Sequence, residues 1–432
     1  MQVVNKIKFL GASGTVTGSS YQIDELLIDL GMFQGGHELN KLNLIRPEID
    51  INKLQGVILT HAHLDHSGRL PWLVKLGYKG PIYMTAATSE LAEIALLDAA
   101  KLNEEDDNYV GQVMKLVKIV EYGQKFVVGS FNCELCDAGH ILGSASVLLE
   151  KNGKKIIFSG DLGNSPEDLL KPTQTFNQAE VVVMESTYGD KEHAQEKPLQ
   201  VLQEEINKIE NDKSTLLIPA FAIERSQEIL HYIDHLKKSK PIKEDTLVFL
   251  DSPMAQKSTQ VYKKYKQLYS PELYEHAQND DPFAFPGLIE TEKTHESLNI
   301  KKSLGAKVII AGSGMMTGGR VLNHAVDVLP NPNNRLLIVG FQAMGTIGRQ
   351  ILDGEKVINI NGQAVFVKAH VRKTSGMSAH ADRPKLLAWL KKISGVEKVF
   401  LTHSEDSVRK IFAQKINHLK VILPSLNAEE SL

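Results

Sequence analysis

The sequence predicts an α/β protein in which one domain is interrupted by another, and three observations support this fold class. Short β-branched runs separated by glycine turns dominate residues 1 to about 190. From about 196 to 350 the pattern changes to strands followed by helices, which is typical of a parallel sheet covered by helices. After about 365 the histidine motifs of the first region return. We therefore expect one domain built from 1–190 and 365–432, and an inserted domain at 191–364.

The individual elements are expected where the hydrophobic pattern has the matching period. Helices are expected at 87–101, 109–120, 223–236, 255–268 and 384–393. Strands in the insertion are expected at 215–219, 246–250, 307–311 and 336–340. Because helix-like stretches follow the first two of these strands, we expect the strands to run parallel.

Composition is that of a large globular protein of a reducing compartment. The 432 residues are 42% hydrophobic, which is enough for two sizeable cores. No run approaches the roughly 18 apolar residues of a membrane span, so no membrane partner is expected. Only Cys133 and Cys136 occur, which excludes a disulfide framework and favours the cytoplasm. Their Cys-x-x-Cys spacing is interpreted as ordinary packing, since no second pair accompanies it.

The most informative motif is His-Ala-His-Leu-Asp-His at 61–66. It follows the apolar run 57–59, so a buried strand can end in a loop that aims His61 and His63 at one point. Asp65 and His66 can then face a neighbouring point. Imidazole and carboxylate groups bind zinc and similar divalent ions, and two adjacent clusters indicate two metals. A polar loop whose histidines only face solvent is the alternative.

Three further ligands are expected from later segments, each at the end of a strand-like run. His140 lies between glycines, Asp161 follows Ser159-Gly160, and His403 ends a run that repeats the Leu-Thr-His of 59–61. Rigid strand ends hold ligands in fixed positions. Taken singly, His140 and His403 could be surface residues and Asp161 a turn residue. As a set with 61–66, they predict a metal site.

At this point the sequence resembles the metallo-β-lactamase superfamily. The resemblance rests on 27–31, 61–66, His140 and 159–161. The segments 184–189, 378–382 and 401–403 are similar to motifs A, B and C of its β-CASP branch, which contains RNase J and the endonuclease subunit of the pre-mRNA cleavage machinery. The resemblance implies an αββα sandwich that carries two metals and an inserted β-CASP cap.

The resemblance also implies roles for the ligands. His61, His63 and His140 would hold one zinc ion, Asp65, His66 and His403 the other, and Asp161 would bridge them. Two zinc ions per chain are expected, and the histidine-rich set favours zinc over manganese. A hydroxide shared by the two metals would attack the phosphodiester.

The catalytic residues expected are Asp65, Glu185 and His380. His380 is the candidate general acid, and Glu185 would hydrogen-bond to it, fix its tautomer and raise its pKa. A helix-capping role for His380 is the alternative, since Asp382-Arg383-Pro384 is typical of a helix start. Asp29 would orient a ligand or the nucleophile from outside the metal shell, with a turn carboxylate as the alternative.

Substrate contacts are expected from Ser313, Ser378 and Arg349. Ser313 lies in a glycine-rich segment, 312–320, between a predicted strand and helix, where backbone N–H groups can bind phosphate. A structural turn explains the same glycines equally well. The segment lacks Gly-Lys-Ser/Thr and is therefore not a nucleotide-hydrolysing loop. For Arg349 a salt bridge is an equal alternative.

The predicted function is a cytoplasmic two-zinc ribonuclease that cuts single-stranded RNA, most simply as an endonuclease. A 5′ exoribonuclease and a small-molecule thioester or lactone hydrolase are the alternatives. An inactive RNA-binding relative is disfavoured because every expected ligand is present. DNA-acting branches of the family carry Val where this chain has His403, so RNA is favoured by analogy. The sequence leaves the oligomeric state open, with a homodimer as one alternative.

Overall fold

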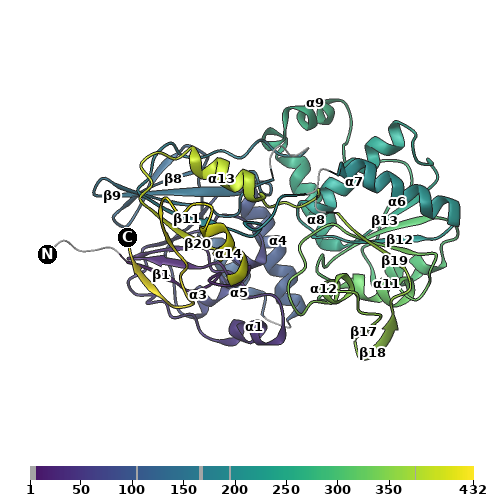
Figure 1. The fold of residues 1–432 in the computed structure, drawn as a ribbon, viewed down its shortest axis with the longest axis horizontal. Helices are drawn as coiled ribbons and strands as arrows, with labels where there is room; N and C mark the ends of the chain where they lie inside the picture. The colour runs from purple at the N-terminus through teal and green to yellow at the C-terminus, as the bar shows by residue number, and fades with distance from the viewer. Residues whose placement is uncertain (1–5, 104–105, 165–168, 194–195, 375) are drawn as a thin grey trace. The chain divides into compact units, whose positions relative to one another are not determined.

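The computed structural model describes residues 6–103, 106–164, 169–193, 196–374 and 376–432 (Figure 1). The chain forms two compact units, and each is described by itself. Unit 1 comprises residues 1–192 and 380–432, and unit 2 comprises residues 193–379. The second boundary falls later than the expected 364/365 because strand β19 (His370–Lys373) pairs with β16 (Arg335–Ile338) of unit 2.

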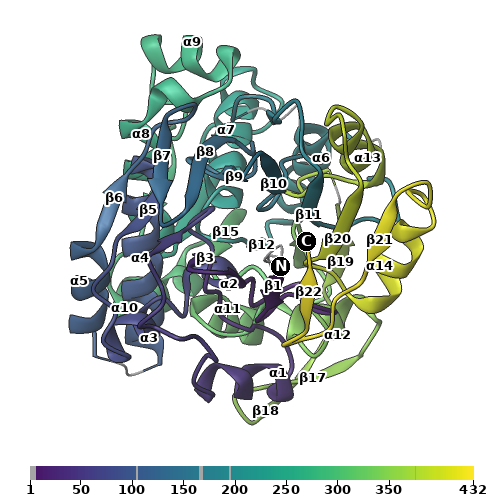
Figure 2. The ribbon, with the colours of Figure 1, turned by 90° about the vertical axis from the view of Figure 1, so that its left-hand side faces the viewer.

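Unit 1 contains two seven-stranded mixed sheets. The first sheet has the order β22 (Glu429–Ser431), β1 (Lys6–Phe9), β2 (Tyr21–Ile23), β3 (Leu26–Ile28), β4 (Gly56–Ile58), β5 (Ile82–Met84), β6 (Val117–Ile119). The second has the order β21 (Lys420–Ile422), β20 (Lys398–Thr402), β11 (Val181–Glu185), β10 (Lys154–Phe158), β9 (Ala145–Lys151), β8 (Phe131–Asp137), β7 (Lys125–Val128). In Figure 2 the yellow strand β22 lies beside the purple β1, so the two ends of the chain share one sheet.

The two sheets of unit 1 pack face to face. Phe9 and Ile58 of the first sheet share one buried cluster with Phe158 and Phe400 of the second. The other face of the second sheet packs against α13 (Arg383–Lys391) and α14 (Asp406–Ala413) through a separate apolar cluster. The remaining helices of unit 1 are α1 (His37–Lys41), α2 (Leu64–Ser67), α3 (Pro71–Lys75), α4 (Ala86–Leu102) and α5 (Asn108–Lys115), with a 3-10 turn at Leu42–Leu44. The expected αββα sandwich is confirmed.

One element of unit 1 differs from the sequence prediction. The pattern predicts a helix over 109–120, but α5 ends at Lys115. The β-branched residues Val117 and Ile119 that follow form β6, which pairs in parallel with β5. Hydrogen bonds to an existing sheet edge outweigh the local helical period here, which is why the prediction was wrong at this end.

Unit 2 is built around a six-stranded sheet in which all pairs are parallel. The order is β14 (Leu288–Glu290), β13 (Leu247–Asp251), β15 (Lys307–Ala311), β12 (Thr215–Pro219), β16, β19. The helices are α6 (Pro198–Asp212), α7 (Arg225–Lys238), α8 (Pro253–Lys264), α9 (Pro271–Asn279), α10 (Thr294–Asn299), α11 (Arg320–Val328) and α12 (Ile347–Leu352), with 3-10 turns at Lys266–Leu268 and Ile300–Lys302. A hairpin, β17 (Val357–Ile360) and β18 (Gln363–Phe366), adds to the core of this unit. The alternation of strand and helix therefore gives the parallel sheet that the sequence predicts.

Two further observations concern membrane-spanning helices and the two cysteines. No helix in the described ranges combines the length and the apolar character needed to cross a bilayer. Cys133 and Cys136 are both buried thiols on β8, outside any disulfide. Cys133 belongs to the core between the two sheets and Cys136 to the cluster under α13 and α14. The two cysteine side chains therefore pack on opposite faces of the sheet that contains β8.

Candidate metal centre

All seven predicted ligands lie in unit 1, on the loops and the short helix that follow its strands. His61, His63 and the start of α2 come directly after β4, and His140 lies between β8 and β9. Asp161 follows β10, and His403 follows β20. Strand β4 belongs to the first sheet and β8, β10 and β20 to the second, so residues distant in sequence meet where the ends of strands from the two packed sheets come together.

Backbone constraints hold these loops close together. A Cβ atom on Gly31 would lie 1.6 Å from the carbonyl oxygen of Asp65, so only glycine permits the loop after β3 to approach the 61–66 segment. Asp29 and His403 both adopt left-handed backbone conformations, with φ of 57° and 53°. Non-glycine residues rarely occupy this region, and such strain is concentrated at functional sites.

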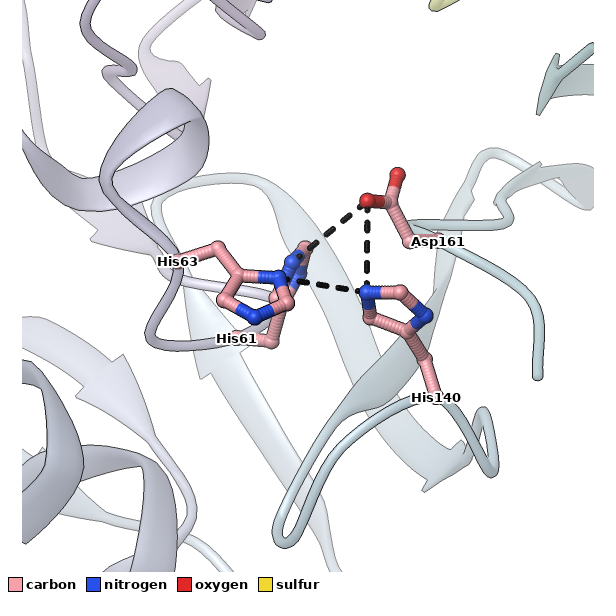
Figure 3. A group of neighbouring side chains, drawn as sticks. All are labelled: His61, His63, His140 and Asp161. Atoms are coloured by element: carbon pink, nitrogen blue, oxygen red, sulfur yellow. Dashed lines mark hydrogen bonds and ion pairs between the residues drawn. The ribbon is translucent and has the colours of Figure 1, made fainter. Parts of the chain in front are cut away.

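The first cluster contains His61, His63, His140 and Asp161 (Figure 3). One possible ligand atom from each residue lies within 4.8 Å of all the others. His63 Nδ1 is 3.2 Å from His140 Nε2. Asp161 Oδ2 is 3.5 Å from His61 Nε2 and 3.6 Å from His140 Nε2. Figure 3 shows the three rings and the carboxylate converging on one point.

The second cluster contains Asp65, His66 and His403. His403 Nε2 lies 3.2 Å from His66 Nε2 and 3.3 Å from Asp65 Oδ2. The other oxygen of Asp161, Oδ1, is 3.2 Å from His66 Nε2 and 3.6 Å from His403 Nε2. The two oxygens of Asp161 therefore face different clusters, which is the arrangement that a bridging carboxylate needs.

Side chains outside the clusters determine which nitrogen of each imidazole faces inward. Asp29 accepts hydrogen bonds from His66 Nδ1 at 2.7 Å and from the Thr60 hydroxyl at 2.8 Å. The single Thr60 proton is thus used, so its oxygen accepts from His61 Nδ1 at 3.1 Å. Thr187 repeats this pattern, since its hydroxyl donates to the carbonyl of His403 and lies 3.0 Å from Nδ1 of that ring. In all three imidazoles the contact is made at Nδ1, which leaves Nε2 facing the cluster, the orientation that a ligand nitrogen needs.

The chemistry of these residues fits divalent metals. Burial lowers the pKa of His61 well below its usual value and that of His63 to about 4, so both are neutral near pH 7. Burial alone would raise the pKa of Asp161, but the neighbouring imidazolium charges, those of His403 first, hold it well below its usual range. Neutral imidazoles and ionised carboxylates, as at His61, His63 and Asp161, are the forms that bind zinc. Burial alone would lower the pKa of His66, but the charges of Asp161 and Asp29 raise it well above its usual value, so a metal bound there would displace a proton. The buried His61 Nε2 has no hydrogen-bond partner among the described residues, which also suits a ligand atom.

Glu185 and His380 form a hydrogen-bonded pair beside the clusters. Glu185, at the end of β11, is 1% exposed, and its Oε1 lies 3.2 Å from His380 Nδ1. The same oxygen accepts from the Leu162 backbone N–H at 2.7 Å, which fixes the carboxylate. Burial alone would lower the pKa of His380, but the negative charge of Glu185, followed by those of Asp161 and Asp65, raises it to about 9. His380 is therefore protonated at neutral pH.

The three predicted substrate residues belong to unit 2. The Ser313 hydroxyl lies 3.0 Å from that of Thr317 and accepts from the Thr317 N–H, so it shapes its own loop. Arg349, on α12, forms the expected alternative, a salt bridge to Asp353 at 2.9 Å. Ser378 is buried near the end of the unit. The structure thus brings the predicted ligands and the Glu185–His380 pair together in unit 1. The three predicted substrate residues lie in unit 2 and belong to neither group.

Sequence reasoning missed the two threonines. Thr60 and Thr187 contact the rings of His61 and His403 at Nδ1 and so position predicted ligands, while neither threonine belongs to a cluster. A signal was present, because Thr60 directly precedes His61 and Thr187 follows Glu185 by two residues. Their importance depends on where a hydroxyl proton points, which a sequence pattern does not show.

Comparison with protein families gives three matches along the chain. Residues 17–220 match the metallo-beta-lactamase superfamily, and residues 226–351 match the Beta-Casp domain. Residues 365–424 match the Zn-dependent metallo-hydrolase RNA specificity domain.

Individual relatives extend over nearly the whole chain. The protein named ribonuclease TTHA0252, of Thermus thermophilus, is 36% identical over 92% of this chain and 92% of its own length. An RNase J-like protein of Methanocaldococcus jannaschii is 32% identical over 95% of each chain. The transcription termination factor FttA of the same organism is 28% identical over 96% of this chain and 69% of its own. A crystal structure of a protein of unknown function from Enterococcus faecalis is similar in fold alone, with a TM-score of 0.56 at 13% identity and full coverage of both chains.

Proposed function

From its membership of the metallo-β-lactamase superfamily and, within it, of the β-CASP ribonuclease family, to which the chain belongs, we propose a function. Together with the geometry of unit 1, this membership favours hydrolysis of single-stranded RNA at internal phosphodiester bonds. The observation that carries the proposal is the pair of the buried Glu185 and the partly exposed His380 beside the ligand clusters. A thioester releases a thiolate, whose usual pKa is near 8.5, and needs no acid. The alkoxide of a ribose is a poor leaving group, so a proton donor at this place favours a phosphodiester over a thioester, and membership of the ribonuclease family favours it over a lactone.

Two zinc ions per chain fit this proposal. His61, His63 and His140 would hold one ion, Asp65, His66 and His403 the other, and Asp161 would contact both. When bound, such a pair supplies Lewis acidity toward a phosphate oxygen and a nucleophile derived from water at neutral pH.

The protein side chains have separate tasks. Asp29, Thr60 and Thr187 hold three ligand rings in the orientation that directs Nε2 inward. His380 holds a proton, and because Glu185 engages its Nδ1, the proton transferred to the departing oxygen comes from Nε2. Burial of Glu185 keeps water from weakening its interaction with the imidazolium.

The remaining assignments follow from the same proposal. Ser313, Ser378 and Arg349 would contact phosphates flanking the cleaved one, Arg349 after giving up its salt bridge to Asp353. The reducing environment implied by two unpaired, buried thiols supports a cytoplasmic enzyme that acts on cellular RNA.

A circular single-stranded RNA tests the proposal. Zinc-loaded protein should linearise the circle, and Asp65→Ala should not, because Asp65 lies 3.3 Å from His403 within the second cluster. An intact circle beside a degraded linear RNA would show an exonuclease. If both RNAs survive while a thioester is hydrolysed, the proposed substrate class is wrong.

A further inference from the structure

Unit 2 contains a second group of histidines that the proposed reaction does not use. His231 and His235 lie on α7, and His276 lies on α9. One ring nitrogen of each lies within 4.8 Å of the others, which makes this the one cluster of potential metal ligands in unit 2 among the described residues. The Nε2 atoms of His231 and His235 are 3.1 Å apart. The ring centroid of His276 lies 5.6 Å from that of His231 and 5.4 Å from that of His235.

The sequence places these rings together through two helices. Residues four apart on a helix share one face, so α7 presents His231 and His235 as neighbours. Helix α9 starts at Pro271, with the Ser270 hydroxyl capping the Leu273 N–H at 3.2 Å, and its last turn carries His276. Ion pairs just beyond α9 hold its end in place, with Lys238 2.6 Å from Asp280 and Lys263 2.7 Å from Asp281.

The surroundings of His276 suit a metal ligand. Its Nδ1 is buried and has no hydrogen-bond partner among the described residues. Its Nε2 faces Asp234 Oδ2 at 3.5 Å and Lys238 Nζ at 3.0 Å. Asp234 is fully buried; its Oδ2 forms an ion pair with Lys238 Nζ at 2.8 Å, and its Oδ1 has no hydrogen-bond partner among the described residues. A carboxylate behind one nitrogen of an imidazole, with the other nitrogen open, is the outer arrangement that orients histidine ligands toward zinc.

The environment of His231 favours a neutral ring, which is the form that binds a metal. Burial, followed by the charges of His235 and His276, lowers the pKa of His231 to about 3, a direction that favours the neutral ring. The charge that competes with a metal ion is the Lys238 ammonium group, which is 44% exposed and pairs both with Asp234 at 2.8 Å and with Asp280 at 2.6 Å. Lys238 can therefore keep a partner while it leaves His276, and the His276 Nε2–H can then donate to Asp234.

We propose that His231, His235 and His276 form a zinc site in unit 2 that joins α9 to α7. Three imidazoles with one open position are an established zinc ligand set. At Zn–N distances of about 2.0–2.1 Å, tetrahedral ligand atoms lie about 3.3 Å apart. The Nε2 atoms of His231 and His235 are 3.1 Å apart, which is close to this value. The site uses none of the residues assigned to the reaction and does not depend on the proposed function.

Zinc counting on the full chain tests this proposal. Wild type, His235→Ala and His370→Ala are equilibrated with the same buffered free zinc, and bound zinc is measured by mass spectrometry. His370 is an exposed histidine of unit 2 on β19, away from the cluster, and serves as the matched control. We expect His235→Ala to hold one equivalent fewer than the other two proteins. Equal zinc content in all three would overturn the proposal.

Further variants guard against misfolding and against indirect loss from unit 1. His276→Gln should lose the same equivalent, and the double variant should lose no more than one, because the residues share one ion. Lys238→Met should bind zinc at least as tightly as wild type, since it removes the competing ammonium group. RNA cleavage by His235→Ala should stay at the wild-type rate. Zinc loss that always accompanies loss of cleavage would place the missing ion in unit 1 and overturn the proposal.

Discussion

Replacing Glu185 by Gln tests the proposed acid through its titration. The carboxylate lies 3.2 Å from His380 Nδ1 and is the main cause that raises the pKa of His380 to about 9. An opposite charge at this distance shifts a pKa by about 1–3 units. A group with a raised pKa donates its proton below that pKa and loses it above, so activity should fall as the pH rises through about 9. Without the carboxylate this alkaline limb should move down to roughly pH 6–8.

The size of the effect follows from the protonated fraction. If the pKa falls from about 9 to about 7, the protonated fraction at pH 8 falls from about 0.9 to about 0.1, and single-turnover cleavage slows about tenfold. At pH 6 the two proteins should differ much less. Glu192→Gln removes an exposed carboxylate that pairs with Arg383 at 2.7 Å and should leave the profile unchanged. An unmoved alkaline limb in Glu185→Gln, with zinc content intact, would refute this account of His380.

Three other predictions concern the ligands and the stability of unit 2. Asp161→Asn should lower the affinity for both zinc ions of unit 1, since its two oxygens face different clusters. Calorimetric titration in the His235→Ala background, which lacks the ion proposed for unit 2, measures this; two ions held as tightly as without the Asn substitution would argue against a bridge. Asp29→Asn should weaken zinc binding about 10–100-fold by releasing His66 Nδ1, and an unchanged affinity would show that Asp29 is only structural. Asp251→Asn should destabilise the protein by about 2 kcal/mol at pH 7 in urea titrations. Burial opposes ionisation of Asp251, but hydrogen bonds outweigh it and lower its pKa to about 2; the donors are His324, Ser297, Thr291 and Arg320. The difference in unfolding free energy between wild type and Asp251→Asn should therefore shrink as the pH falls from 4 toward 2. A difference that stays constant over this range would contradict the prediction.

The architecture, and the residues that the structure groups as candidate metal ligands, were accessible from the sequence because both depend on local patterns. Strand-like runs that end in His, Asp or Gly predict where the ligands lie, and the switch from short strands to alternating strands and helices predicts the parallel sheet of unit 2. The end of α5 was not accessible, because β6 forms only where the edge of β5 is available.

Contacts between residues distant in sequence set the limit of prediction. Thr187 acts on His403 through a hydroxyl whose direction depends on the fold. His276 joins His231 and His235 only once α9 packs against α7, although the spacing of the latter pair is visible in the sequence. Arg349 is a local case: the sequence allowed a phosphate contact or a salt bridge, and the structure shows the salt bridge, to Asp353 four residues along the chain.

The most direct test of the central claim, that His380 protonates the departing oxygen, is cleavage of RNA in which a bridging oxygen is replaced by sulfur. His380→Ala should cut an ordinary RNA about 10²–10⁴-fold more slowly than wild type, with its zinc retained. A thiolate leaves without a proton, so with sulfur at the 3′ or the 5′ bridging position the two proteins should cut at nearly equal rates at one of these positions. If the defect of His380→Ala is equally large on both sulfur substrates, His380 is not the general acid.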